Sequence, residues 1–115
     1  MAAQLIDGNK IAADIKADVS RRVSALKARG ISPGLAAIIV GDNAASISYV
    51  SGKAADCAEV GIFSETFHLP ESSTHDEVLA LIARLNADDR FHAILPQRPM
   101  PRQIEEREVI DAMLA

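Results

Sequence analysis

The chain has 115 residues, of which 49% are hydrophobic and 24% charged, and this length and balance are those of one globular domain with its own core. Sixteen acidic and twelve basic side chains give a net charge of -4. Without a basic cluster, and with three Phe and one Tyr for base stacking, nucleic acid is not an expected partner. No apolar run reaches the length of a bilayer, so no membrane partner is expected.

The N-terminus and the cysteine content predict the cellular compartment. The opening MAAQLIDGNK lacks the basic stretch, apolar block and cleavage site of a secretory signal. Cys57 is the only cysteine, which excludes an internal disulfide and fits a reducing compartment. We expect a cytoplasmic protein with one domain over residues 1–115.

The first forty residues predict a helix followed by a central strand. From Asp7 to Ala28 apolar residues recur at three- and four-residue steps, which predicts an amphipathic helix ended by Gly30. The apolar run from Leu35 to Val40 is typical of a strand buried on both faces of a parallel sheet. The apolar residues of the helix are Ile11, Ile15, Val19, Val23 and Leu26.

A second helix and strand follow. Asn43 is a good N-cap for a helix from about Ala44 to Val60, and Gly61 supplies its C-terminal stop. The stretch from Ile62 to Leu69 alternates imperfectly and is predicted as a strand, closed by Pro70.

The last third repeats the alternation of helix and strand. Thr74 and Glu77 form a capping box that opens a helix running to about Asn86. Ala93 to Leu95 is predicted as a short buried strand, and Gln103 to Leu114 has roughly helical spacing. The predicted fold class is therefore α/β, a three-layer α/β/α arrangement with a mostly parallel sheet. Ligands of such sheets bind beyond the carboxyl ends of the strands, where GDNAAS and PQRPMP lie.

One face of the helix after GDNAAS carries the first candidate site. Ser46, Tyr49 and Lys53 are spaced three and then four residues apart, so they share a helical face. This spacing places a tyrosine hydroxyl beside the lysine ammonium. If the ammonium is buried, burial destabilises its charge and prepares the lysine for proton transfer. The alternative is a surface tyrosine packed along a lysine stem, and the spacing alone leaves both open.

Longer strings resemble a known family. VGDNAASISYVSGKAADCAEVGI, Val40 to Ile62, is similar to the signature around the folate site of methylenetetrahydrofolate dehydrogenase/cyclohydrolases. LPESSTHDEVLALIARLNAD and the opening LIDGNKIA continue the resemblance. Ile94 to Pro101 lies where the family has V-Q-L-P-L-P. The chain thus resembles that family's N-terminal folate-binding catalytic domain along nearly its whole length.

The resemblance implies a role for each matching residue. Tyr49 would pack against the folate, Lys53 would be the central acid/base group of the cyclohydrolase step, and Gln97 would orient Lys53 by a hydrogen bond. The predicted catalytic residues are therefore Lys53 and Gln97, and the predicted substrate-binding residues are Ser46, Tyr49, Pro99 and Pro101.

The resemblance also implies the reaction and what the chain lacks. The family oxidises 5,10-methylenetetrahydrofolate with NADP and hydrolyses 5,10-methenyltetrahydrofolate to 10-formyltetrahydrofolate. Neither the family's nucleotide-binding domain nor its D-K-D-V-D-G-F stretch falls within 115 residues. We therefore expect a tetrahydrofolate derivative as partner, no cofactor bound by this chain, and impaired dehydrogenase activity. The alternative is an inactive shortened paralogue that acts as a self-association module, for example as a homodimer.

Two departures from the family string bear on Gln97. Pro96 cannot donate to a sheet ladder, so it should end the strand one residue before Gln97, and the glutamine is then either held or displaced. Arg98 either points inward and repels Lys53 or points to solvent, where a glutamate such as Glu105 is a candidate partner. The cost of burying an unpaired guanidinium favours the outward direction.

The histidines and the GDNAAS loop give weaker signals. His68, His75 and His92 share no ligand-like spacing, so no metal site is expected. GDNAAS at a helix N-terminus is able to cradle an anion, but it has one glycine and no P-loop lysine. A helix cap is the favoured interpretation.

Overall fold

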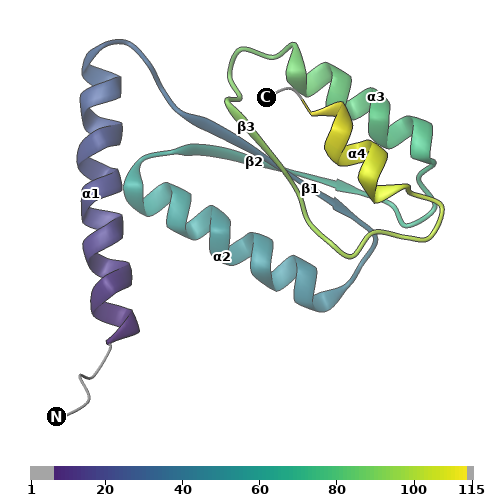
Figure 1. The fold of residues 1–115 in the computed structure, drawn as a ribbon, viewed down its shortest axis with the longest axis horizontal. Coiled ribbons are helices and arrows are strands. Elements are labelled where there is room, and N and C mark those ends of the chain that lie inside the picture. The colour runs from purple at the N-terminus through teal and green to yellow at the C-terminus, as the bar shows by residue number, and fades with distance from the viewer. Residues whose placement is uncertain (1–6, 114–115) are drawn as a thin grey trace, which may run out of the picture.

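The sheet consists of three parallel strands, and the helices lie on both of its faces (Figure 1). The structure is a computed structural model that describes residues 7–113. Its elements, in chain order, are α1 Gly8–Ala28, β1 Gly34–Val40, α2 Ala44–Val60, β2 Phe63–Leu69, α3 His75–Asn86, β3 Ala93–Pro96 and α4 Glu106–Ala112.

Strand β1 is the centre of the sheet, as its apolar run predicted. The strand order is β2-β1-β3, and both pairings are parallel. The register runs from Gly34 opposite Phe63 to Val40 opposite Leu69 on one side. On the other side, Ile38 lies opposite Pro96. All three carboxyl ends therefore point the same way.

Alternate residues of β1 build two separate cores. Ala36, Ile38 and Val40 belong to a cluster with α3 and α4, whereas Ala37 and Ile39 pack with Val50 of α2. Successive side chains of a strand point to opposite faces, so one strand serves both cores. The predicted three-layer α/β/α fold with a parallel sheet is confirmed. The buried residues of α3 and α4 are Val78, Leu81, Ile82, Leu85 and Val109.

The caps predicted for α2 and α3 are present, and Asp7, for which no cap was predicted, caps α1. The Asp7 side chain accepts from the N–H groups of Asn9 and Lys10, the Asn43 side chain accepts from Ser46, and Thr74 accepts from Glu77. Gly61 ends α2 in the left-handed conformation with φ 90°. Local sequence signals thus fixed where α1, α2 and α3 begin.

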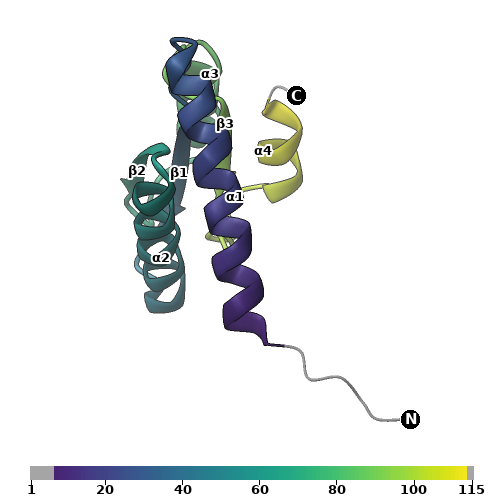
Figure 2. The same ribbon diagram turned by 90° about the vertical axis from the view of Figure 1, so that its left-hand side faces the viewer.

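Helix α1 is largely exposed, and the start predicted for α4 needs correction. Only Val23 of α1 is buried, and Ile15 is 58% exposed, because α1 packs against the C-terminal end of α2 and not on the sheet (Figures 1 and 2). Helix α4 begins at Glu106 and not at Gln103, since the chain first makes a turn in which the Ile104 N–H donates to the Pro101 carbonyl. Leu114, the predicted end, lies outside the described residues. Within residues 7–113, no helix has the length and apolarity to cross a membrane.

Replacing Gly34 by alanine should destabilise the fold. Gly34 is buried at the start of β1, and a Cβ there would lie 1.9 Å from the Arg90 carbonyl oxygen. We expect Gly34→Ala to lower the free energy of unfolding, measured by urea denaturation, by about 1–3 kcal/mol. Gly52→Ala in α2, where a Cβ meets nothing within 4 Å, should instead raise it by about 0.5–1 kcal/mol. Equal stability of the two variants would contradict this packing.

Candidate functional site

The loops after β1 and β3 meet at the carboxyl edge of the sheet. A groove of about 160 Å³ lies between them. This is the edge at which the sequence placed the site, and residues on either side of the groove come from segments far apart in the chain. The groove is lined by Val40, Gly41, Asp42, Asn43, Glu71, Pro99, Met100 and Pro101.

Lys53 and Gln97 are joined across this edge. The Lys53 ammonium donates to Gln97 Oε1 over 2.9 Å, although the residues lie 44 positions apart. The Gln97 N–H donates to the Ile38 carbonyl of β1, also over 2.9 Å. The glutamine is therefore held by the central strand and is not displaced.

Pro96 is the last residue of β3, as predicted. Successive N–H groups of a strand point to opposite edges, and Gln97 already points to β1. The position of the missing Pro96 N–H therefore faces the outer edge of β3, where no strand of the described residues pairs. The proline thus leaves the hydrogen bond that positions Gln97 intact.

Tyr49 and Lys53 lie on the accessible side of α2. Tyr49 is 61% exposed, and Lys53 is exposed as well. Among the described residues no hydrogen bond joins the two side chains, and the partner of Lys53 is the side-chain oxygen Oε1 of Gln97. Burial of the lysine charge, one possibility raised by the sequence, is not what the structure shows.

Ser46 is buried, with 2% of its surface exposed, and so differs from Tyr49 and Lys53 on the same helical face. Its hydroxyl donates to the Arg98 carbonyl over 3.3 Å, and its N–H donates to the Asn43 side chain over 3.0 Å. Ser46 therefore ties the start of α2 to the loop after β3. Contact between this hydroxyl and a substrate stays a prediction.

Arg98 points outward, as burial cost predicted. Its side chain is 69% exposed, and Nε donates to Glu106 Oε2. The suggested partner Glu105 is wrong, because the neighbouring glutamate faces the loop. The other oxygen of Glu106 accepts from the Met100 N–H over 2.9 Å.

Glu106 was missed by the sequence analysis. Its carboxylate receives hydrogen bonds from the Met100 N–H and from Arg98, and these hold the pKa of Glu106 below its ordinary value. The only sequence signal was an acid eight residues after Arg98, at the start of a short helix. The peptide bond between Arg98 and Pro99 is cis.

The three histidines each contact the chain at a different place. His68 lies 2.7 Å from the Gly41 carbonyl, His75 accepts from the Glu105 N–H, and His92 accepts from the Gly34 N–H. Within residues 7–113 no group of three or more His, Cys, Asp or Glu side chains is placed to hold a metal ion. Cys57 is buried, and burial raises the pKa of its thiol.

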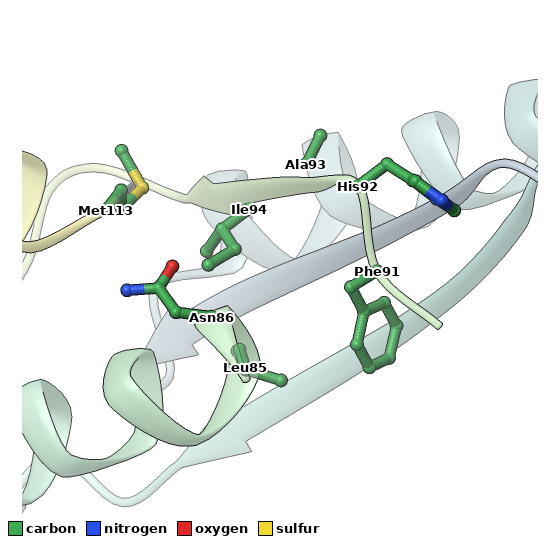
Figure 3. Close-up of a pocket in the computed structure, with 7 residues that line it drawn as sticks. All are labelled: Leu85, Asn86, Phe91, His92, Ala93, Ile94 and Met113. Carbon is green, nitrogen blue, oxygen red and sulfur yellow. The ribbon is translucent and has the colours of Figure 1, made fainter. Parts of the chain in front are cut away.

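A larger cleft of about 490 Å³ lies away from these residues, beside the start of β3 (Figure 3). The end of α3, the segment entering β3 and the end of α4 enclose it, and Asn86 donates across it to the Ala112 carbonyl. None of its lining residues carried a predicted role. They are Leu85, Asn86, Phe91, His92, Ala93, Ile94 and Met113.

Comparison with known proteins identifies the family. The family model described as tetrahydrofolate dehydrogenase/cyclohydrolase, catalytic domain, matches residues 6–115. The chain belongs to this family. The resemblance found in the sequence is thereby confirmed.

Relatives and solved structures of the tetrahydrofolate dehydrogenase/cyclohydrolase family show how much of it the chain spans. The bifunctional protein FolD of Moorella thermoacetica is 50% identical over 113 residues, which are 98% of this chain and 40% of that protein. That of Anaeromyxobacter dehalogenans is 54% identical over 109 residues, which are 95% of this chain and 39% of that protein. The chain thus spans 39–40% of the length of these relatives.

Crystal structures of family members share the fold. The Campylobacter jejuni bifunctional enzyme FolD superposes with a TM-score of 0.95 at 43% identity, over 98% of this chain and 40% of that chain. The Trypanosoma brucei dehydrogenase-cyclohydrolase, complexed with NADP cofactor and inhibitor, superposes with a TM-score of 0.91 at 30% identity, over 99% of this chain and 39% of that chain. The chain is therefore the N-terminal catalytic domain of this family.

Removing the Ser46 hydroxyl should loosen the tie between α2 and the loop after β3 in this family domain. Ser46→Ala and the control Ser48→Ala, an exposed serine of the same helix, gain the same helix propensity. Only the first loses a buried hydrogen bond, so its free energy of unfolding should be lower than the control's by about 1 kcal/mol. Urea denaturation measures the difference, and equal values would show that the Arg98 contact contributes nothing.

Proposed function

We propose that this chain is the folate-binding catalytic part of a methylenetetrahydrofolate dehydrogenase/cyclohydrolase, and that Lys53 and Gln97 carry its hydrolytic step. The observation that carries the proposal is the 2.9 Å hydrogen bond between Lys53 Nζ and Gln97 Oε1 at the carboxyl edge of the sheet. In open α/β sheets this edge is where ligands bind. The membership of the chain in the folate family supplies the substrate class.

The reaction is the hydrolysis of 5,10-methenyltetrahydrofolate. Water adds to the amidinium-like carbon between the two nitrogens, and cleavage of one carbon–nitrogen bond leaves 10-formyltetrahydrofolate. The water oxygen becomes the formyl oxygen and gives up both of its protons, one of which passes to the departing nitrogen and the other to solvent, so a single group that accepts and returns protons serves both steps. Lys53 is exposed, so both substrate and water have access to it.

In this proposal Gln97 orients Lys53 for these proton transfers. Its Oε1 accepts from the ammonium, while its Nε2 donates to the Arg98 carbonyl over 3.0 Å. The second bond fixes which end of the amide faces Lys53. An oriented acid/base group is more effective than a freely rotating one because its reacting geometry is set in advance.

The remaining predicted residues form the walls of the folate site in this proposal. Tyr49 presents a largely exposed ring one helical turn before Lys53, which suits stacking against a planar heterocycle. Pro99 and Pro101 line the groove across from the Asn43 end of α2. The folate would thus lie along α2 with its reactive carbon toward Lys53.

The dehydrogenase step requires a nicotinamide cofactor, and the described residues do not fit one. The loop between β1 and α2 holds one glycine, Gly41, and the Ser46 N–H in the first turn of α2 is already capped by the Asn43 side chain. Dinucleotide loops instead need several glycines for close approach of the pyrophosphate. We therefore assign this domain the folate half of the chemistry and no hydride transfer of its own. We also propose that it works in the cytoplasm.

Replacing Lys53 by alanine should remove hydrolysis. The chain should consume methenyltetrahydrofolate, followed by its absorbance, faster than buffer does. Lys53→Ala should slow this by about 10²–10⁴-fold, the usual contribution of a positioned acid/base group. Binding of a folate analogue should change far less, because Tyr49 and the groove remain.

The control is Lys10→Ala, which removes a lysine from α1, outside the site. It should hydrolyse like the unmodified chain. Absence of folate binding together with turnover equal to buffer would overturn the proposed function. Turnover that survives in Lys53→Ala would overturn the role of the lysine alone.

A second candidate function is self-association without catalysis, and exposed apolar residues on α1 favour it. Ile11 and Ile15, on the apolar face of this amphipathic helix, are 47% and 58% exposed. Adjacent exposed isoleucines on one helical face are a common feature of protein interaction surfaces.

Sedimentation over a range of concentrations tests this second candidate. If α1 forms the interface, the chain should be dimeric, and Ile15→Lys should make it monomeric because it places a charge in the contact. The control Ile110→Lys, at an isoleucine 47% exposed on α4, should stay dimeric. A chain that is monomeric at all concentrations would contradict self-association.

A further inference from the structure

In the segment from Gln97 to Pro101, one backbone carbonyl orients the side-chain amide of Gln97. The Arg98 carbonyl oxygen accepts two hydrogen bonds, from Gln97 Nε2 over 3.0 Å and from Ser46 Oγ over 3.3 Å. The first of these bonds sets the direction of the amide whose oxygen faces Lys53. Any shift of the Arg98 backbone therefore reaches Lys53 through a single side chain.

Glu106 forms hydrogen bonds with the same segment. One carboxylate oxygen accepts from the Met100 N–H over 2.9 Å, and the other accepts from Arg98 Nε. The carboxylate thus bridges two positions that flank Pro99. Among the described residues it is the only carboxylate that bonds to residues 97–101, and its side chain is 25% exposed.

The base of Glu106 is itself fixed. It is the first residue of α4, and Val109 of that helix is fully buried in the core with α3. The Glu105 N–H donates to His75 Nδ1 over 3.1 Å, and Glu108 bonds to the other nitrogen of the same ring. A carboxylate on a pinned helix end is able to hold a loop in place, because it does not move with that loop.

We propose that Glu106 is a positioning residue that fixes the backbone of residues 98–100, so that the Arg98 carbonyl keeps the Gln97 amide directed at Lys53. This inference rests on the proposed function and adds to it a residue that touches neither substrate nor Lys53. Glu106 also neutralises Arg98, the only cation of the segment, and keeps its guanidinium away from the Lys53 ammonium. The depressed pKa of Glu106 agrees with a carboxylate that is charged and doubly bonded.

Nuclear magnetic resonance of the 115-residue chain tests the geometry without any turnover. In Glu106→Ala the Met100 N–H and Arg98 lose their partner, so the side-chain amide signals of Gln97 should shift. Glu106→Gln retains an acceptor for Met100 and should lie closer to the unmodified chain. The control Glu105→Ala changes the adjacent exposed glutamate, which makes no side-chain cap bond, and should leave those signals in place.

If Glu106→Ala fails to fold, Glu106→Asp gives the same test, since it keeps the charge but withdraws the carboxylate by one methylene. Unshifted Gln97 amide signals in a folded Ala or Asp variant would overturn the proposal. So would equal shifts in Glu105→Ala, because they would show a general effect of the helix end.

Kinetics of methenyltetrahydrofolate hydrolysis form the second arm. Glu106→Ala should lower kcat by about tenfold, within the range by which a displaced reacting group slows an enzyme, and leave KM nearly unchanged. Glu106→Gln should recover most of the loss. A raised KM with an unchanged kcat would overturn a positioning role. If the unmodified chain shows no turnover, the proposed function fails, and the amide signals decide the inference about Glu106 on their own.

Discussion

The position of β1 between two strands and two helical layers is the constraint on which the rest of the structure depends. Both edges of β1 are paired in parallel, and its side chains alternate between the core with α3 and α4 and the core with α2. An all-apolar strand is stable only with both faces covered. The helices must therefore lie on opposite faces, and the carboxyl ends of all three strands must meet at one edge. The site follows from that geometry, because loops that leave neighbouring parallel strands at one edge are brought together.

The same strand positions Gln97 and, through α2, Lys53. The Ile38 carbonyl binds the Gln97 N–H, so the backbone of the central strand determines where the glutamine stands. Helix α2 begins at Ala44, four residues after β1 ends, and is capped by Asn43. That short connection leaves α2 little freedom, and Lys53 comes within 2.9 Å of Gln97. Two residues far apart in sequence thus meet because Gln97 directly follows β3, and Lys53 lies on the helix that follows the neighbouring strand β1.

Local signals predicted most of the fold and less of the site. Apolar runs and caps located β1, α2 and α3 because these signals act between near neighbours in the chain. The exposure of Ile15 was not predicted, since periodicity tells which face of a helix is apolar but not what covers it. The Lys53 and Gln97 pair was expected from family resemblance, not from spacing. Glu106 was missed because a carboxylate that bonds to a loop eight residues away leaves no periodic trace in the sequence.

Pro96 and Arg98, two of the departures from the family string, leave the contacts of Gln97 intact. The N–H that Pro96 lacks would have pointed to the outer edge of β3, so the bond from Gln97 to Ile38 survives. Arg98 replaces an apolar residue, yet its guanidinium turns to Glu106 and is 69% exposed. A buried, unpaired cation beside Lys53 would have cost far more than a solvated ion pair. The Gln97 N–H therefore still bonds to Ile38, and its side chain still bonds to Lys53 and to the Arg98 carbonyl, so neither altered side chain breaks a hydrogen bond that holds Gln97 against Lys53.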